Sequence, residues 1–134
     1  MYLRQLKLCT WLTLGWMCFQ LKRNTGVWQS VEYSSFSVGP ESDKYRLSVS
    51  GFSGDTDDAL AAPTNPATNN NGMQFSTKDQ DNDMKPNGRC SEVGHGWWFN
   101  NCSRSRLNSD HPAYWDASVR VRSVTFARML VKFN

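Results

Sequence analysis

The feature that most constrains the fold of this chain is the lack of any sustained helical stripe. No window of its 134 residues repeats apolar side chains at the spacing of an amphipathic helix. Tyr45, Leu47 and Val49 instead alternate with polar side chains, which is typical of a strand buried on one face. Residues 61–72 hold two Pro, four Asn and no large apolar side chain, and so predict an exposed loop. We expect one α+β domain of mostly short antiparallel strands, with long ordered loops and little helix.

In the other segments predicted as strands, the alternation of apolar and polar residues is interrupted. Residues 31–38 have strand composition, but the apolar face changes between Tyr33 and Phe36, which indicates a bulge or a bend. Gly51 is expected to end the strand that begins at Tyr45. Residues 119–126 and 129–133 predict two more strand-like runs near the end of the chain.

The charge of the chain is unevenly distributed. The net charge is +3, but the segment from Asp55 to Asp83 holds six Asp and one Lys, while both flanking segments are basic. Nucleic-acid binding requires Lys and Arg gathered into one stripe, so this distribution argues against a nucleic-acid partner. A cation is the expected partner of the acidic segment.

Residues 1–26 form a hydrophobic leader in this interpretation, and residues 27–134 form the domain. The uncharged run 8–21 follows Arg4 and Lys7, as in a secretory signal, but no cleavage site of small residues follows it. Its fourteen residues fall short of the roughly 20 needed to span a bilayer. The leader is therefore a signal peptide, an uncleaved anchor or a foreign segment, and membrane contact is expected only for the anchor.

The acidic segment contains a candidate cation site. Asp79, Asp81 and Asp83 alternate along one loop, and hard cations such as calcium need several oxygen ligands from such a loop. An EF-hand would require Gly and Glu where this chain has Met84 and Cys90. A phosphotransfer site would require a buried apolar strand before the first Asp, and those residues are polar. The alternative to a metal is a solvated loop whose Asp side chains bond their own backbone.

Several motifs stand in a specific order in the second half of the chain. The sequence runs NNNGMQFSTKDQDND, then a Cys, then GHGWWFNNC, then RLN. This order resembles the fibrinogen C-terminal-like domain found in fibrinogen, ficolins, tachylectins and angiopoietins. YSSFSV, KYRLSVSGFSGD and FARMLVKF also stand where that family has similar stretches. The resemblance covers roughly residues 27–134 and implies the second half of such a domain, without the N-terminal subdomain of the family.

The resemblance implies a calcium site and four groups that bind the ion. They are the carboxylates of Asp81 and Asp83 and the backbone carbonyls of Lys85 and Asn87. Asp79 then braces the loop. Coordination of this kind is ordinary for calcium, which is the one cofactor that we expect.

The resemblance also implies a disulfide and a recognition pocket beside it. Cys90 and Cys102 match the second disulfide of the family, and a cis peptide is expected at Asn101-Cys102. In ficolin-like and tachylectin-like members this pocket takes an acetyl group, and in fibrinogen it takes a peptide N-terminus. Backbone N–H groups near Asn101 and Cys102 would hold the acetyl oxygen.

Aromatic side chains are expected to complete this pocket. Trp97 and Trp98 are the candidate walls, and at least one of them is expected in the core because adjacent strand residues point to opposite faces. Ser103 stands where the family usually has His, and the family's longer loop with pocket aromatics is shortened here. Tyr114 and Trp115 are candidate replacements for those aromatics.

The expected function is binding without catalysis. We expect a secreted, calcium-stabilised recognition module, lectin-like toward acetylated glycans in innate defence. The alternatives are a module of the angiopoietin or fibrinogen type that binds extracellular protein or matrix, and a truncated fragment that binds nothing. An enzyme is not expected, because neither His95 nor His111 stands beside an evident nucleophile.

Overall fold

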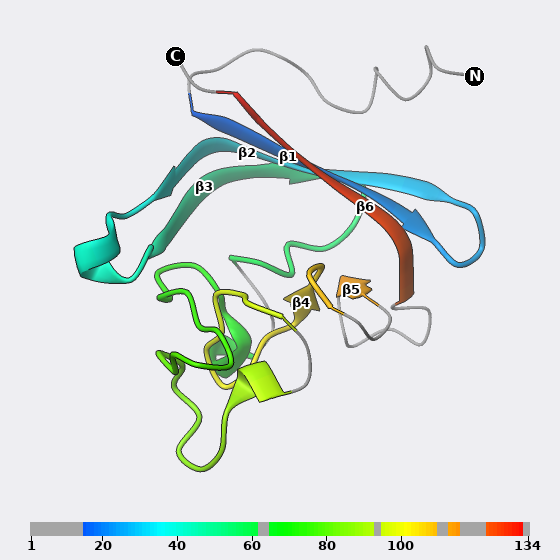
Figure 1. Cartoon of the computed structure of the whole chain (residues 1–134). Coiled ribbons are helices and arrows are strands. Elements are labelled where there is room, and N and C mark those ends of the chain that lie inside the picture. The colour runs from blue at the N-terminus through cyan, green and yellow to red at the C-terminus, as the bar shows by residue number, and fades with distance from the viewer. Residues whose placement is uncertain (1–14, 62–64, 93–94, 110–112, 116–122, 133–134) are drawn as a thin grey trace.

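The computed structural model of the chain describes residues 15–61, 65–92, 95–109, 113–115 and 123–132 (Figure 1). These residues contain six strands and three short 3₁₀ turns: β1 (Trp16–Arg23), β2 (Trp28–Val38), η1 (Glu41–Asp43), β3 (Leu47–Gly54), η2 (Pro66–Thr68), η3 (Cys90–Glu92), β4 (Ser105–Arg106), β5 (Ala113–Trp115) and β6 (Ser123–Lys132). No helix among the described residues is long and apolar enough to cross a membrane.

All six strands form one sheet in the order β3-β2-β1-β6-β5-β4. Every neighbouring pair is antiparallel. The antiparallel sheet and the scarcity of helix agree with the predicted architecture, whereas the α part of the predicted α+β class has no counterpart in the described ranges. The described parts of the two runs predicted near the end of the chain form the single strand β6, and residues 119–122 of the first run lie outside the described residues.

Strand β1 lies within residues 1–26, the segment predicted as a hydrophobic leader. It pairs with β2 on one side and with β6 on the other. Seven of its eight residues are buried, as expected of a strand covered on both faces. Cys18 lies fully buried on this strand and is disulfide-bonded, while Cys9 and the rest of residues 1–14 lie outside the described residues. The sheet therefore begins inside the segment predicted as a leader.

In strands β2 and β3, the face that points toward the core changes at the same position along the paired strands. Tyr33 pairs with Phe52, whereas Phe36 pairs with Val49; Tyr33 belongs to the buried core cluster and the partly buried Phe36 packs against it. Between these pairs Gly51 adopts a φ of 71°, in the left-handed region that favours glycine. A Cβ atom at this position would overlap the Ser34 hydroxyl. The β2–β3 pairing keeps one register from Val31 to Val38, so the bulge offered as one alternative is absent, and Gly51 lies within β3 and does not end it.

The core lies between the sheet and the loops beneath it (Figure 1). We call residues 65–92 and 95–104 the loop lobe. The sheet contributes seven buried side chains from its first three strands, and the loop lobe contributes three aromatic ones: Met17, Phe19, Leu21, Val31, Tyr33, Leu47, Val49, Trp97, Trp98 and Phe99. Trp115 of β5 is also fully buried and lies 5.1 Å from Phe19 between ring centroids.

The Asn-rich loop is not simply exposed as predicted. Asn70 is fully buried, and its Nδ2 donates a hydrogen bond of 2.6 Å to the carbonyl of Trp98. Asn71 continues the sheet beyond its edge strand, since its Oδ1 accepts from Val49 N (2.9 Å) and its Nδ2 donates to Val49 O (3.1 Å). The Asn71 amide therefore holds the loop lobe against β3, while the Asn70 amide joins two segments within the loop lobe.

Candidate functional site

The acidic loop is ordered by hydrogen bonds from its own residues. Thr77 Oγ1 donates to Asp79 Oδ1 (2.7 Å), and this bond, followed by the backbone N–H of Asp79, holds the pKa of Asp79 below its usual range. Asp81 Oδ1 accepts from the backbone N–H of Asp83 (3.2 Å). Asp79 has the contacts of a bracing residue, and Asp81 forms an Asx turn of the kind considered as the alternative to a metal site.

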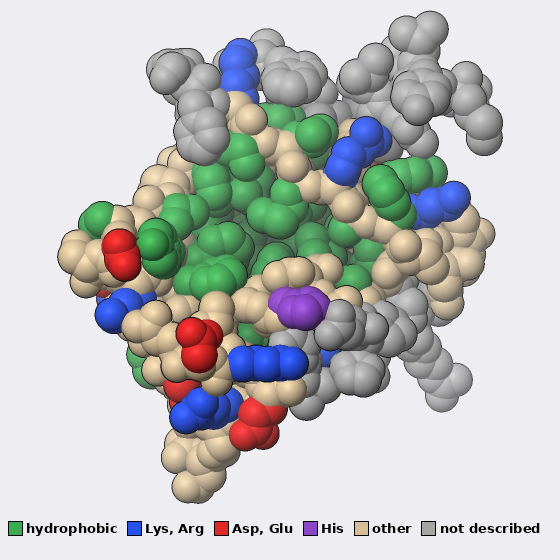
Figure 2. All heavy atoms as spheres, in the orientation of Figure 1, with side chains coloured by type: hydrophobic (Ala, Val, Ile, Leu, Met, Phe, Trp, Pro, Cys, Tyr) green, Lys and Arg blue, Asp and Glu red, His purple; other side chains and the backbone are tan. Residues whose placement is uncertain are grey.

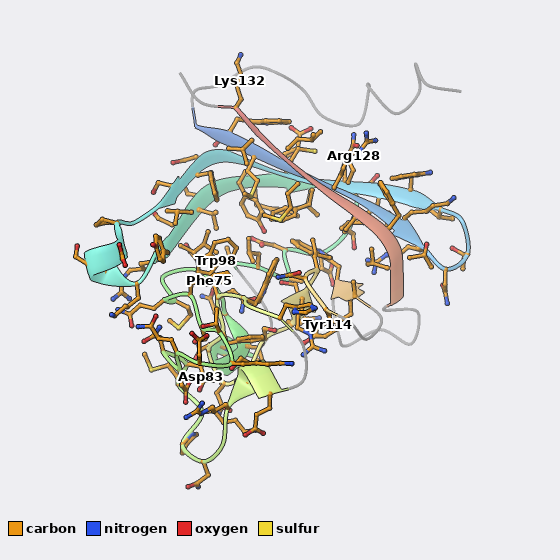
Figure 3. All side chains as sticks on the ribbon, viewed as in Figure 1. Phe75, Asp83, Trp98, Tyr114, Arg128 and Lys132 are labelled. Atoms are coloured by element: carbon orange, nitrogen blue, oxygen red, sulfur yellow. A yellow bond between two sulfur atoms is a disulfide. The ribbon has the colours of Figure 1, made fainter. Side chains whose placement is uncertain are left out.

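Asp83 connects two ends of this loop. Its Oδ1 accepts from Lys85 N (2.9 Å) and its Oδ2 accepts from Cys90 N (2.8 Å). Its side chain therefore fixes the turn over residues 83–90 and joins it to the disulfide. In Figure 3, Asp83 lies in the loop lobe, away from the sheet.

The donor set of the predicted calcium site fits a hard cation. It consists of two exposed or half-exposed Asp side chains and the carbonyls of Lys85 and Asn87, all of them oxygen donors. Within the described ranges, neither of these carbonyls accepts a hydrogen bond. The described residues contain no group of three or more His, Cys, Asp or Glu able to hold a metal, and the predicted set includes only two such side chains.

The disulfide implied by the resemblance is present. Cys90 and Cys102 are bonded with a Cα–Cα distance of 5.5 Å, and the Asn101-Cys102 peptide is cis. The backbone N–H of Asn101, predicted to hold an acetyl oxygen, instead donates to Ala67 O (2.9 Å). Cys102 O accepts from the N–H of Asn100 (2.7 Å), which closes a tight turn beside the disulfide.

Trp97 and Trp98 are both buried, with 2% and 9% of their surface exposed. Their ring centroids lie 5.4 Å apart in an edge-to-face arrangement. Both rings line a pocket of about 390 Å³, but Asn101, Cys102 and Ser103 do not. The two Trp therefore line a pocket that does not include the backbone groups with which they were predicted to act.

Other residues complete this pocket, and the sequence did not point to them. Phe75 packs edge-to-face on Trp98 with centroids 5.2 Å apart, and both side chains lie beneath the sheet in Figure 3. Ala127 and Met129 of β6 line the side formed by the sheet. Ala127 and Met129 stand two residues apart, with Arg128 between them, which in a strand places them on the same face.

The candidate replacement aromatics have different environments. The Tyr114 hydroxyl lies 3.3 Å from Ser103 Oγ, beside the disulfide-bonded Cys102. Trp115 lies in the core, where its Nε1 donates to Asp57 O (2.8 Å). Of the two, only Tyr114 lies next to the predicted recognition residues.

Comparisons with known proteins identify relatives along most of the chain. Residues 5–128 match the family model of the C-terminal globular domain of fibrinogen beta and gamma chains, so the match starts inside the predicted leader. The mouse fibrinogen gamma chain is 46% identical over 98 residues, which cover 66% of this chain and 22% of the mouse chain. A fibrinogen C domain-containing protein of Xenopus laevis is 42% identical over 77 residues, which cover 57% of this chain and 15% of that protein.

Solved structures share the fold. The fibrinogen-like globe domain of human ANGPTL2 superposes with a TM-score of 0.73 at 28% identity, covering 89% of this chain and 58% of that chain. A lamprey fibrin D-dimer in complex with the peptide ligand Gly-His-Arg-Pro-amide superposes with a TM-score of 0.69 at 27% identity, covering 87% and 44%. The chain thus spans only part of each relative. With its antiparallel sheet, its cis Asn101-Cys102 peptide and its Cys90–Cys102 disulfide, the chain belongs to the family of fibrinogen C-terminal globular domains.

Proposed function

We propose that this chain is a secreted recognition module, stabilised by calcium, that binds an extracellular protein or peptide without converting it chemically. The observation that carries the proposal is the connection between the acidic loop and the recognition loop. Asp83 Oδ2 accepts from Cys90 N (2.8 Å), and Cys90 is bonded to Cys102 of the cis peptide. The Asp83 side chain, which orders the acidic loop, therefore also positions the residues beside the disulfide.

Two observations favour a protein or peptide ligand over an acetylated glycan. The Asn101 N–H expected to bind an acetyl oxygen already donates to Ala67 O. The lamprey fibrin D-dimer, which shares this fold, is described in complex with a peptide ligand. An acetylated glycan is the second candidate, because the hydroxyls of Ser103 and Tyr114 lie together beside Cys102, where they could bond sugar hydroxyls.

Calcium would be held by the carboxylates of Asp81 and Asp83 and by the carbonyls of Lys85 and Asn87. When bound, calcium would neutralise the repulsion between the two carboxylates. Asp83 positions the loop through its two backbone hydrogen bonds, and the Arg89 guanidinium, which donates to Lys78 O (2.9 Å), holds the two sides of the loop together.

Calcium titration of three chains tests the metal part of the proposal. Asp81→Asn removes one charged ligand but keeps an oxygen that can accept from Asp83 N. We expect this change to weaken calcium binding by at least about tenfold, measured by calorimetry and by tryptophan fluorescence. Asp79→Asn is the matched control and should change the affinity by less than about twofold. Absence of calcium binding to the unmodified chain, or equal losses in both variants, would contradict the assignment.

Binding of defined probes tests the ligand part. Fluorescence anisotropy of labelled Gly-His-Arg-Pro-amide is measured against the full chain, with calcium and with chelator, and an N-acetylglucosamine conjugate is measured in parallel. Saturable peptide binding that weakens on chelation supports the proposal. Binding of the sugar conjugate alone would replace it with the lectin function, and binding of neither probe would count against both.

A further inference from the structure

The loop lobe contains two Asn-Gly dipeptides, Asn71-Gly72 and Asn87-Gly88. In such a dipeptide the backbone nitrogen of Gly can attack the side-chain carbonyl carbon of Asn, because Gly has no Cβ atom to crowd that nitrogen. The two glycines have similar backbone conformations, with φ of 81° at Gly72 and 83° at Gly88. The dipeptide sequence and the glycine backbone therefore do not distinguish the two sites, whereas their hydrogen bonds do.

The first dipeptide is held by three hydrogen bonds to β3. Asn71 Oδ1 accepts from Val49 N (2.9 Å), and Asn71 Nδ2 donates to Val49 O (3.1 Å). The N–H of Gly72 donates to Leu47 O (2.9 Å). These bonds engage both the side-chain amide that would be attacked and the nitrogen that would attack it. The folded state therefore protects Asn71, because the bonds must break before the two groups can react.

The second dipeptide has no such bonds. Asn87 and Gly88 are both exposed, and among the described residues neither the Asn87 amide nor the Gly88 N–H has a hydrogen-bond partner. Asp83 accepts from Lys85 N and from Cys90 N, so the dipeptide lies in the turn between these two bonds. Figure 2 shows charged side chains gathered over the lower part of the molecule, where the loop lobe meets solvent. Water therefore reaches this turn, and the Asn87 side chain can turn toward the Gly88 nitrogen.

We propose that Asn87 is a site of spontaneous deamidation and that Asn71 is protected from the same reaction. The Gly88 nitrogen forms a bond to Cγ of Asn87, the Cγ–Nδ2 bond breaks, and ammonia leaves with the proton of the Gly88 N–H. Water then opens the cyclic imide at one of its two carbonyl carbons and gives aspartate or isoaspartate. In isoaspartate the chain runs through Cγ, and the former main-chain carbonyl of Asn87 becomes a free carboxylate.

Either product adds a negative charge to the exposed turn. The reaction consumes only water and requires no enzyme. It depends neither on bound calcium nor on the proposed recognition function, so each can fail without the other.

Peptide mapping by mass spectrometry follows both sites in one sample. The full chain is incubated at neutral pH with chelator present, so that calcium cannot affect the result. We expect Asn87 to convert at least about tenfold faster than Asn71, which must first break its bonds to Val49. Chromatography should resolve an isoaspartate product at position 87. Equal rates at the two sites, or an aspartate product alone, would overturn the proposal.

Two controls separate the structure from the sequence. In concentrated urea the two sites should convert at similar rates, because Asn71 has then lost its bonds to Val49. A tenfold preference for Asn87 that persists in urea would overturn the role of the fold. Asn87→Gln keeps a side-chain amide but would need a larger ring, and should abolish conversion at this position while Asn71 is unchanged. Continued loss of ammonia at position 87 in this variant would overturn the cyclic route.

Discussion

At the scale of single residues, Tyr33 shows how burial and a neighbouring charge act on one group. Its side chain is fully buried on β2, and its hydroxyl donates to Asp58 Oδ1. Burial first, and then the hydrogen bond and the negative charge of Asp58, raise the pKa of Tyr33 far above the ordinary value near 10. The folded state therefore keeps this phenol protonated when an unfolded chain would lose the proton.

The pH dependence follows from the raised pKa of Tyr33. The stability that it contributes is fully present below the unfolded pKa near 10, and is lost as pH rises toward the higher folded pKa. We expect the folded chain and Tyr33→Phe to give equal tyrosinate absorbance before alkaline unfolding begins. In denaturant the two chains should differ by one tyrosine. A difference already present in the folded chains would contradict this assignment.

At the scale of elements, β1 organises the sheet because it lies between β2 and β6. Phe19 at its centre is fully buried and contacts the rings of Tyr33 and Trp115. Phe19→Ala should lower the free energy of unfolding by about 3–5 kcal/mol, measured by denaturant titration, because it leaves a cavity among aromatic side chains. Val27→Ala, at a position 55% exposed in the turn after β1, should change it by less than about 0.5 kcal/mol. Similar losses in both variants would show that β1 is not central to stability.

That β1 was not predicted as a strand has a physical cause. A strand buried on both faces shows no alternation, and the uncharged run 8–21 that contains most of it matches the length and flanks of a signal peptide. The alternating residues of β3 were predictable because one face of that strand is covered and the other meets solvent. The pairing of β1 with β2 and β6 could not be inferred, because each partner is recognised only when the three strands are folded together.

The residues of the candidate site were also predictable only in part. Cys90, Cys102 and the acidic loop were identified from motifs that fix chemistry at close sequence separation. The use of the Asn101 N–H by Ala67 was not predictable, because that bond joins loops 34 residues apart. The pocket beside Trp97 also depends on β6, which enters the sheet only at the end of the chain.

At the scale of the whole molecule, the sheet and the loop lobe are held together by a few directed contacts. Asn71 bonds both backbone groups of Val49, and Trp98 Nε1 donates to Tyr45 O. The Asn71 amide also covers part of the free edge of β3, where unpaired backbone groups would otherwise meet another chain. Loss of this one side chain should therefore affect both the contact between the two parts and the tendency to aggregate.

Asn71→Ala tests this role. We expect the free energy of unfolding to fall by about 1–3 kcal/mol in urea titration, because a buried donor and a buried acceptor of Val49 lose their partner. Light scattering during the titration should rise earlier than for the unmodified chain. Asn24→Ala, in the exposed turn after β1, is the control and should leave both measurements unchanged. A stable, non-aggregating Asn71→Ala chain would show that the loop lobe is anchored elsewhere.

The position of β6 has a consequence for synthesis on the ribosome. Trp16 pairs with Lys132, so β1 waits for a partner strand that is translated long after it. A nascent chain exposes the apolar faces of β1 and β2 until β6 has been translated. The sheet can therefore close only after β6 has been translated, and the incomplete sheet is the species on which a chaperone would act.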